Sequence, residues 1–516
     1  MSAEPAIAQR SPLLRTAIVV GAIVAGGNLL GFVRDMLIAA LFGATAKTDA
    51  FMTAWTIPET TSSILMEGAL AFVLIPLLSR EIAQRGELVP VIRRTLAPLL
   101  LLVAALSLAT LAGAPVLVQL LAPGLRDPHA AITCLRLAAG TVFFMGAAGY
   151  LSAVLESEER FLVPALVYVA YNVGIITTTV MFHRTFGVLA AAAGLTIGAA
   201  CMLIVQLPLF VRRLGGLRQV VAWSPSSPGL LVALLPAALF FAVRQSQVWV
   251  ERFLGSFLPS GAITHLNYAS KTAQVPVTLT LALATVSFPT ICRLLASGDR
   301  ERSGRALEHV LATALALVIP ATVCLILFAP GIVAGLYQRG QFLPGDAHAT
   351  ATIMRVYSTG LPAQVVVSIA VLPFFGARRL WPPVRVAVVG VLVGAAVSLA
   401  LLRAWGADAI AAGNAAGITL MGILLLSSLH RHLTPVDIRR LAAAGARVAV
   451  VSCAAGAGGY LVASLLPGGV SEPPGAFTGL AAVGGLYVAT GVATGVAEIE
   501  PILDALRNRP KQRRFA

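Results

Sequence analysis

Charged side chains inside otherwise apolar segments are the residues of this chain best suited to chemistry. Six of them form a candidate substrate-binding set: Arg34, Asp35, Glu67, Arg244, Arg252 and Lys271. An ionised side chain within a bilayer is costly, so each should face a cavity or a partner. Four of the six are cations, and arginine binds phosphate groups bidentately. The set therefore predicts a cavity for an anionic substrate that carries phosphates.

A structural interpretation of the same residues stays open. Arg34 and Asp35 are adjacent opposite charges, as are Glu251 and Arg252, and each pair could neutralise itself. Glu67 could equally pair or cap within a helical bundle. Arg244 and Arg252 are eight positions apart, a rotation of about 80° on a helix, so they could face one cavity at two depths.

Enzyme chemistry has no support in the sequence. The five cysteines lie singly in apolar segments, and none of the seven histidines forms a metal-spaced pair with a carboxylate. There is no phosphate-binding loop of the ATPase type. We expect no catalytic residue, no cofactor and no metal site.

Long apolar segments must position the charged residues. The chain is 58% hydrophobic and only 11% charged, which exceeds what one water-soluble core can hide. Apolar runs long enough to cross a bilayer as helices fill nearly all of it. The sequence predicts an all-α polytopic membrane protein, and the 30 prolines predict interrupted helices. About fourteen spans are expected, at 14–42, 48–78, 96–122, 131–155, 161–182, 186–211, 228–254, 262–292, 306–336, 348–376, 382–403, 408–429, 441–466 and 475–497.

A loose internal repeat predicts how the spans are grouped. The segment 34–80 resembles the segment 252–293, and both begin on an odd-numbered span. Two parallel six-helix lobes around a central cavity are a transporter architecture. We therefore expect an N-terminal lobe at 1–220, a C-terminal lobe at 221–435, and two extra spans with a basic tail at 436–516.

Arginines collect in alternate gaps between the spans. One side carries clusters such as Arg212–Arg213 and Arg439–Arg440, whereas the other carries little beyond five cations: Lys47, Arg126, Arg184, Arg339 and Arg403. Positive charge stays on the cytoplasmic side, so both termini should be cytoplasmic in the inner (plasma) membrane. The net charge of +15 is spread over short loops, which argues against a nucleic-acid partner.

Several motifs resemble a known family. Gly31–Asp35, Phe42–Ala44, Thr48–Phe51, Pro58, Glu67–Ala69 and Ile75–Pro76 resemble the N-terminal signature of the MurJ/MviN lipid II flippases. Asn267–Ala269, Gln274–Pro276 and Ala284–Pro289 resemble the eighth span of that family. The resemblance continues more weakly along all fourteen expected spans.

The resemblance implies a fold, a substrate and a mechanism. The family belongs to the multidrug/oligosaccharidyl-lipid/polysaccharide exporter superfamily. Its members move an undecaprenyl-pyrophosphate-linked peptidoglycan precursor to the outer leaflet by alternating access, using a cationic cavity between two lobes and a lipid-tail groove at the last two helices. Arg34 matches a cavity arginine of the family, and Asp35 and Asp49 match neighbouring acidic positions. The implied partners are this lipid-linked anionic glycan and membrane lipids, and we expect a monomer.

Four positions depart from the family pattern. Asn28, Ser62, Ser63 and Lys271 stand where many members have arginine. Arg244 and Arg252 could compensate for the lost cations. Three other functions therefore stay open: export of another lipid-linked oligosaccharide or exopolysaccharide, cation-coupled drug antiport, and a scaffold without transport. The energy source also stays open between membrane potential, sodium and protons.

Overall fold

Helices make up the regular structure of this chain throughout the part that is described. The computed structural model describes residues 10–64, 74–75, 78–79, 89–213, 229–377, 379 and 381–494, and these ranges contain no strand. Ten helical segments in them are long and apolar enough to cross a membrane, or eleven if Pro344–Ser358 and Leu361–Gly376, which meet at a bend, count together as one span. The predicted class, an all-α polytopic membrane protein, is confirmed.

The helix ends agree closely with the apolar runs. Most predicted spans correspond to one helix or to a broken pair, but the predicted second span, 48–78, lies partly outside the described residues. The count of fourteen therefore stays a prediction.

Interrupted helices are confirmed. Helices α14, α16, α18 and α19 each have proline at the first or second position. Proline has no N–H to donate to the preceding turn, so a new helix begins there without losing a hydrogen bond. Between α17 and α18 the chain bends by 49°.

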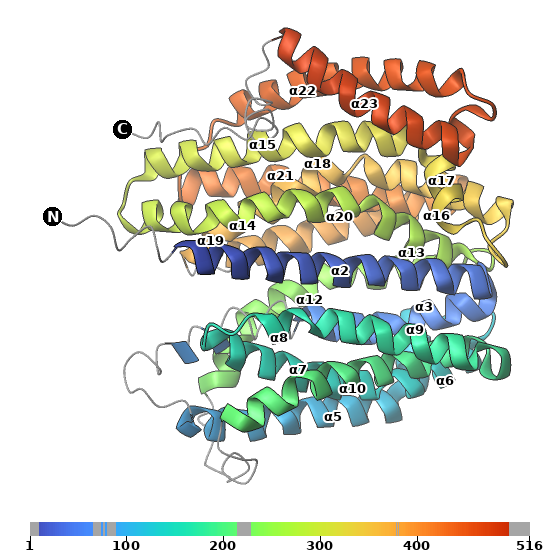
Figure 1. Ribbon diagram of the computed structural model, residues 1–516, viewed down its shortest axis with the longest axis vertical. Coiled ribbons are helices and arrows are strands. Elements are labelled where there is room, and N and C mark those ends of the chain that lie inside the picture. The colour runs from blue at the N-terminus through green and yellow to red at the C-terminus, as the bar shows by residue number, and fades with distance from the viewer. Residues whose placement is uncertain are drawn as a thin grey trace. The chain divides into compact units, whose positions relative to one another are not determined.

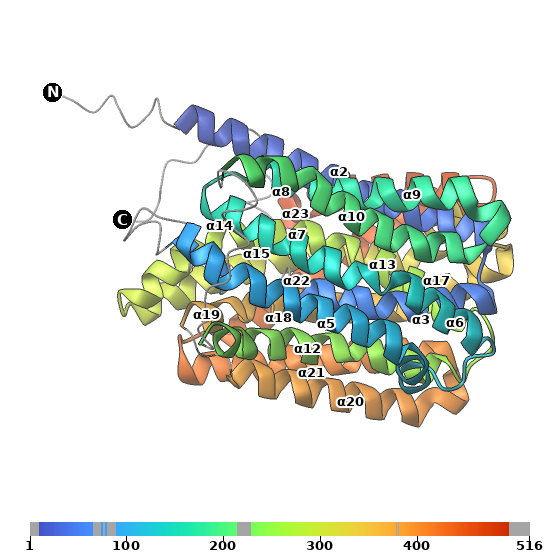
Figure 2. The same ribbon diagram turned by 90° about the horizontal axis from the view of Figure 1, so that it is seen from below.

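The first compact unit contains residues 1–263. Its helices are α2 (Arg10–Phe42), α3 (Ala46–Ser62), α5 (Val89–Leu121), α6 (Pro128–Ala138), α7 (Gly140–Ser157), α8 (Leu162–Ala165), α9 (Val167–Phe186), α10 (Val188–Arg213) and α12 (Gly229–Gly255). Helices α9 and α10 run side by side, and α2 packs on α9 (Figures 1 and 2). Helix α3 packs against α6, α7, α10 and α12, and most of its residues are buried, so it lies in the interior of the unit.

The second compact unit contains residues 264–516, so its boundary lies within the first turn of α13. Its helices are α13 (Ala262–Ala273), α14 (Val275–Ala296), α15 (Arg300–Leu327), α16 (Ala329–Tyr337), α17 (Pro344–Ser358), α18 (Leu361–Ala370), α19 (Leu372–Gly376), α20 (Trp381–Trp405), α21 (Ala407–His432), α22 (Ile438–Ser464) and α23 (Pro473–Thr494), with the short 3-10 helix η2 (Gly469–Ser471). Helices α20 and α21 form one close pair, and α22 and α23 form another beside α15 (Figure 1). A Cβ on Gly417 would lie 2.5 Å from the carbonyl oxygen of Gly390, so glycine is needed for the first pair to approach this closely.

The grouping of helices differs in one respect from the expected lobes. Helix α12 packs on α3 and α5 of the first unit, although the predicted boundary at 220/221 assigns it to the C-terminal lobe. The predicted second repeat also begins, at Arg252, on this helix. The lobe boundaries and the repeat stay predictions, whereas α22 and α23 pack into the second unit beside α15.

Candidate substrate-binding site

Arg34 is the centre of a buried polar cluster in the first unit. Its Nε and Nη2 atoms both lie 2.9 Å from Oδ1 of Asp35, the next residue on α2. Its Nη1 donates to Oδ1 of Asn172 on α9 over 2.8 Å. The guanidinium carbon lies 4.4 Å from the ring centroid of Trp55 on α3. Three helices therefore converge on one arginine, forming what we call the Arg34 cluster: Arg34, Asp35, Trp55 and Asn172.

The partners of Arg34 are themselves held in place. The Nδ2 group of Asn172 donates to the carbonyl oxygens of Gly27 and Tyr168, each over 3.0 Å, which turns the amide oxygen toward Arg34. Gly31 faces the same amide, because a Cβ there would lie 3.4 Å from Asn172 Nδ2. The small residues of α2 thus let α9 approach closely enough for the hydrogen bond to form.

The Arg34 cluster neutralises a charge and still leaves donors unused. Arg34 is 8% exposed and Asp35 4%, and a buried charge is tolerated only with a partner of opposite charge. Guanidinium has five N–H donors, and three are used by Asp35 and Asn172. The other two have no partner among the residues that the structure describes. A phosphate oxygen could accept from them, with the Trp55 ring face stabilising the cation.

Asp49 accepts a backbone hydrogen bond within the first unit. It lies in the first turn of α3, and its Oδ2 accepts from the Gly261 N–H over 2.6 Å. The cavity beside it, also lined by Arg126 and Ser256, has a volume of about 10 Å³. That space is about one water molecule in size, so these contacts suit a structural role for Asp49.

Arg252 also has partners inside the first unit. Its Nε donates to Thr56 Oγ1 over 3.1 Å and its Nη1 to the Ile263 carbonyl over 3.3 Å, and the residue is 2% exposed. One turn earlier on α12, Trp249 Nε1 donates to Thr60 Oγ1 over 3.0 Å. These contacts hold α12 on α3.

Three further candidates are Arg244, Lys271 and Glu67. Arg244 is exposed on α12, although it shares that continuous helix with buried Arg252, so the two arginines have different environments. Lys271 is half-buried on α13 in the second unit. Glu67 lies outside the described residues. Substrate contact by any of these residues stays a prediction.

Sequence reasoning missed three residues that matter here. Asn172 is a polar residue in the middle of an apolar span, which is a signal that could have marked it. Thr56 and Thr60 are less visible, because the hydroxyl of a threonine in a helix often donates to the backbone of its own helix, as both do here. Their second bonds, to Arg252 and Trp249, appear only in three dimensions.

Helices of membrane-spanning length, with buried charges inside the spans, define a polytopic membrane protein. The sequence profile of the lipid II flippase MurJ family matches residues 38–472. The match covers most of the chain, so the chain belongs to that family. It includes Asp49, Arg252 and Lys271, whereas Arg34 and Asp35 precede it.

Relatives at moderate identity extend over most of the chain. A probable lipid II flippase MurJ from Rhizobium meliloti is 29% identical over 439 residues, covering 81% of this chain and 80% of the relative. The lipid II flippase MurJ of Burkholderia cenocepacia is 29% identical over 401 residues, covering 74% and 76%. A probable lipid II flippase MurJ from Vibrio cholerae is 25% identical over 460 residues, covering 84% and 87%.

Solved structures share the fold. Lipid II flippase MurJ in an inward closed conformation superposes with a TM-score of 0.78 at 19% identity, covering 92% of this chain and 99% of that one. An inward-facing multidrug resistance transporter of the MATE family gives 0.66 at 15% identity, covering 83% and 98%. The fold is therefore that of the MurJ and MATE transporters of the MOP superfamily, as the sequence motifs predicted.

Proposed function

We propose that this protein transports lipid II, the undecaprenyl-pyrophosphate-linked peptidoglycan precursor, from the cytoplasmic to the outer leaflet of the inner membrane. Membership of the lipid II flippase family, matched over residues 38–472, is the observation that carries the proposal. The relatives named as lipid II flippases match over about three quarters or more of this chain, which supports the same substrate.

The Arg34 cluster is the proposed contact for the pyrophosphate. Two of the five guanidinium N–H groups of Arg34 have no acceptor within the described structure. The orientation of the side chain is fixed by Asp35, Asn172 and Trp55. A preoriented guanidinium binds a phosphate with less loss of side-chain freedom than a mobile one. Asp35 lowers the net charge of the cluster, which would weaken binding enough for the substrate to be released on the other side.

Orientation and oligomeric state belong to the same proposal. We propose that both termini are cytoplasmic, because arginines are concentrated in alternate gaps. One copy of the chain contains both helical units, which supports a transporter that works as a monomer.

Complementation tests the substrate. A strain depleted of its own lipid II flippase should grow when this chain is expressed, and a membrane-inserted Arg34→Ala variant should not support growth. Failure of the unaltered chain to restore growth, at normal membrane abundance, would count against lipid II.

A second substrate has one observation in its favour. Asn28, Ser62, Ser63 and Lys271 differ from the arginines of the family pattern, so another lipid-linked glycan with a less charged linkage is the second candidate. Transport of such a glycan without rescue of lipid II flipping would select it.

A further inference from the structure

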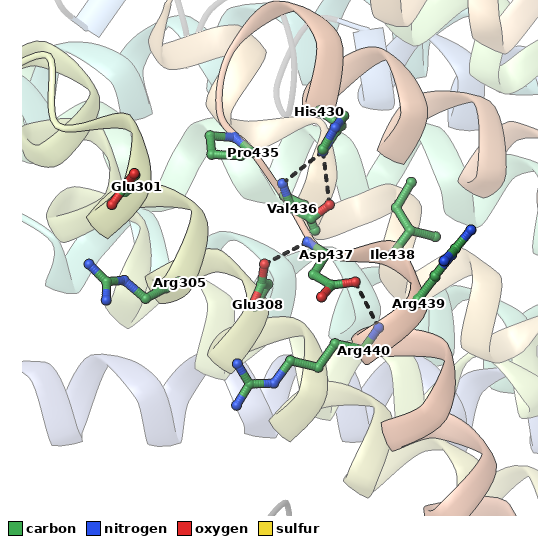
Figure 3. A pocket seen from close by; sticks show the side chains of 10 residues that line it. All are labelled: Glu301, Arg305, Glu308, His430, Pro435, Val436, Asp437, Ile438, Arg439 and Arg440. Carbon is green, nitrogen blue, oxygen red and sulfur yellow. Dashed lines mark hydrogen bonds between the residues drawn. The ribbon is translucent and has the colours of Figure 1, made fainter.

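A groove of mixed charge lies at the N-terminal ends of α15 and α22 in the second unit (Figure 3). Its volume is about 660 Å³, and its charged lining includes Glu301, Arg305 and Glu308 from α15 and Arg440 from α22. A hollow of about 290 Å³ shares Arg305, Glu308 and Arg440. The two hollows together form one surface that we call the α15–α22 groove.

The groove becomes less charged along the helices. Beyond the residues that the two hollows share, the smaller hollow is lined by His309, Ala312 and Thr313 on α15 and by Leu441 and Ala444 on α22. Both helices are candidate membrane spans that begin at this end. The charged end therefore lies at the depth of lipid headgroups, and Ala312, Leu441 and Ala444 lie toward the hydrocarbon.

Backbone contacts hold the walls of the groove. The Asp437 N–H donates to Glu308 Oε1 over 2.6 Å, and Asp437 Oδ1 accepts from the Arg440 N–H over 3.0 Å (Figure 3). Thr434 donates its hydroxyl hydrogen to the Arg300 carbonyl oxygen, so the segment between α21 and α22 is fixed on α15. These bonds engage one oxygen each of Glu308 and Asp437.

Three charged side chains that line the groove are exposed: Glu301, Arg305 and Arg440. Within the described part of the chain, none of these side chains has a hydrogen-bond or ion-pair partner. In Figure 3 the Arg440 side chain extends from α22 toward α15, whereas Arg439 points the other way. The groove thus presents cations and carboxylates together. A ligand that carries both charges fits this lining better than a simple anion does.

We propose that the α15–α22 groove binds a resident membrane phospholipid with a phosphoethanolamine headgroup. The lipid phosphate accepts hydrogen bonds from Arg305 and Arg440, and its ammonium group donates to Glu301. One acyl chain follows Ala312, Leu441 and Ala444. The groove contains no residue of the Arg34 cluster, so this lipid is distinct from the transported substrate.

The test uses the full chain in nanodiscs of dioleoyl phosphatidylethanolamine, phosphatidylglycerol and phosphatidylcholine in equal amounts. Native mass spectrometry of the released protein identifies the lipid that stays bound. We expect phosphatidylethanolamine to be retained over phosphatidylcholine, whose quaternary ammonium cannot donate hydrogen bonds, and over phosphatidylglycerol, which has no cation.

Variants of the groove residues test whether the preference for phosphatidylethanolamine arises in the α15–α22 groove. Replacing Arg305 and Arg440 together by Gln should lower phosphatidylethanolamine retention by about three- to tenfold, since partly exposed charge pairs contribute modestly. Glu301→Gln should shift retention toward phosphatidylglycerol. Arg431→Gln is the matched control and should leave lipid retention unchanged. Arg431 is an exposed arginine in the last turn of α21, and it lines neither hollow.

Three results would overturn the proposal. Preferential retention of phosphatidylglycerol by the unaltered chain would make the groove a simple anion site. Equal retention of all three lipids is the result expected if the groove instead takes a protein segment. Undiminished phosphatidylethanolamine retention in the Arg305/Arg440 double variant would place the lipid elsewhere.

Discussion

Asn172→Asp adds a second negative charge to the Arg34 cluster. The new carboxylate keeps an acceptor where the amide oxygen lies, 2.8 Å from Arg34 Nη1, but it also loses the Nδ2 group that donates to the Gly27 and Tyr168 carbonyls. The pair of Arg34 and Asp35 is formally neutral, and the variant cluster has a charge of −1. We therefore expect the variant to lose transport and to be less stable than the unaltered chain.

The magnitude depends on the distance between the new carboxylate and the phosphate. For an assumed separation of about 4 Å, the added charge costs up to about 4 kcal/mol at an effective dielectric constant of about 20. Relaxation and water reduce this value, so a loss of transport of at least about tenfold is expected. Asn172→Leu is the uncharged comparison: it loses the same Nδ2 donor and the acceptor for Arg34, destabilising the fold by about 1–3 kcal/mol, but it adds no negative charge.

The assay compares flipping of a fluorescent lipid-linked substrate in proteoliposomes with thermal unfolding in detergent. Thr178→Ala is the matched control, because Thr178 lies on the same helix and its hydroxyl donates only to the Gly174 carbonyl within α9. Unchanged flipping by a well-folded Asn172→Asp protein would refute the assignment of phosphate binding to the Arg34 cluster.

Three further predictions concern orientation and the role of α12. Of two cysteines introduced at exposed positions, Ser297→Cys should be protected from an impermeant thiol reagent outside intact cells and Gln341→Cys should react; the reverse pattern would invert the proposed topology. Arg252→Gln and Thr56→Val should each lower the unfolding temperature. In the double variant the decrease should be smaller than the sum of the two single decreases, because both substitutions remove the same hydrogen bond; strict additivity would argue against that bond. Arg244→Gln should lower the unfolding temperature less than Arg252→Gln because Arg244 is exposed and Arg252 is buried, and an equal loss would contradict this difference in burial.

The sequence predicted what local hydrophobicity determines. The runs at 382–403 and 408–429 become α20 and α21 almost residue for residue, since a bilayer-spanning helix satisfies its own backbone hydrogen bonds. Arg34 and Asp35 could be singled out for the same reason: a charge inside such a run is conspicuous without knowledge of the fold.

Contacts between distant helices could not be predicted from the sequence. Asn172 is 138 positions from Arg34, and Thr56 is 196 positions from Arg252, so nothing in the local pattern relates them. The packing of α12 on α3 was missed for that reason, because the predicted repeat assigned α12 to the other lobe. The two arginines of α12 were paired from helical rotation alone, whereas packing on α3 buries Arg252 and leaves Arg244 exposed.

The central claim is that this chain flips lipid II with Arg34 as the contact for the pyrophosphate. Its most direct test is the rate at which lipid II crosses the bilayer of proteoliposomes containing the unaltered chain, Arg34→Ala or Arg34→Lys at equal protein content. The account predicts flipping by the unaltered chain, none above the protein-free background for Arg34→Ala, and partial flipping for Arg34→Lys, which keeps the charge but loses the bidentate donor pair. Flipping by a folded Arg34→Ala protein at the unaltered rate would contradict the role of Arg34, and no flipping by the unaltered chain would contradict lipid II as its substrate.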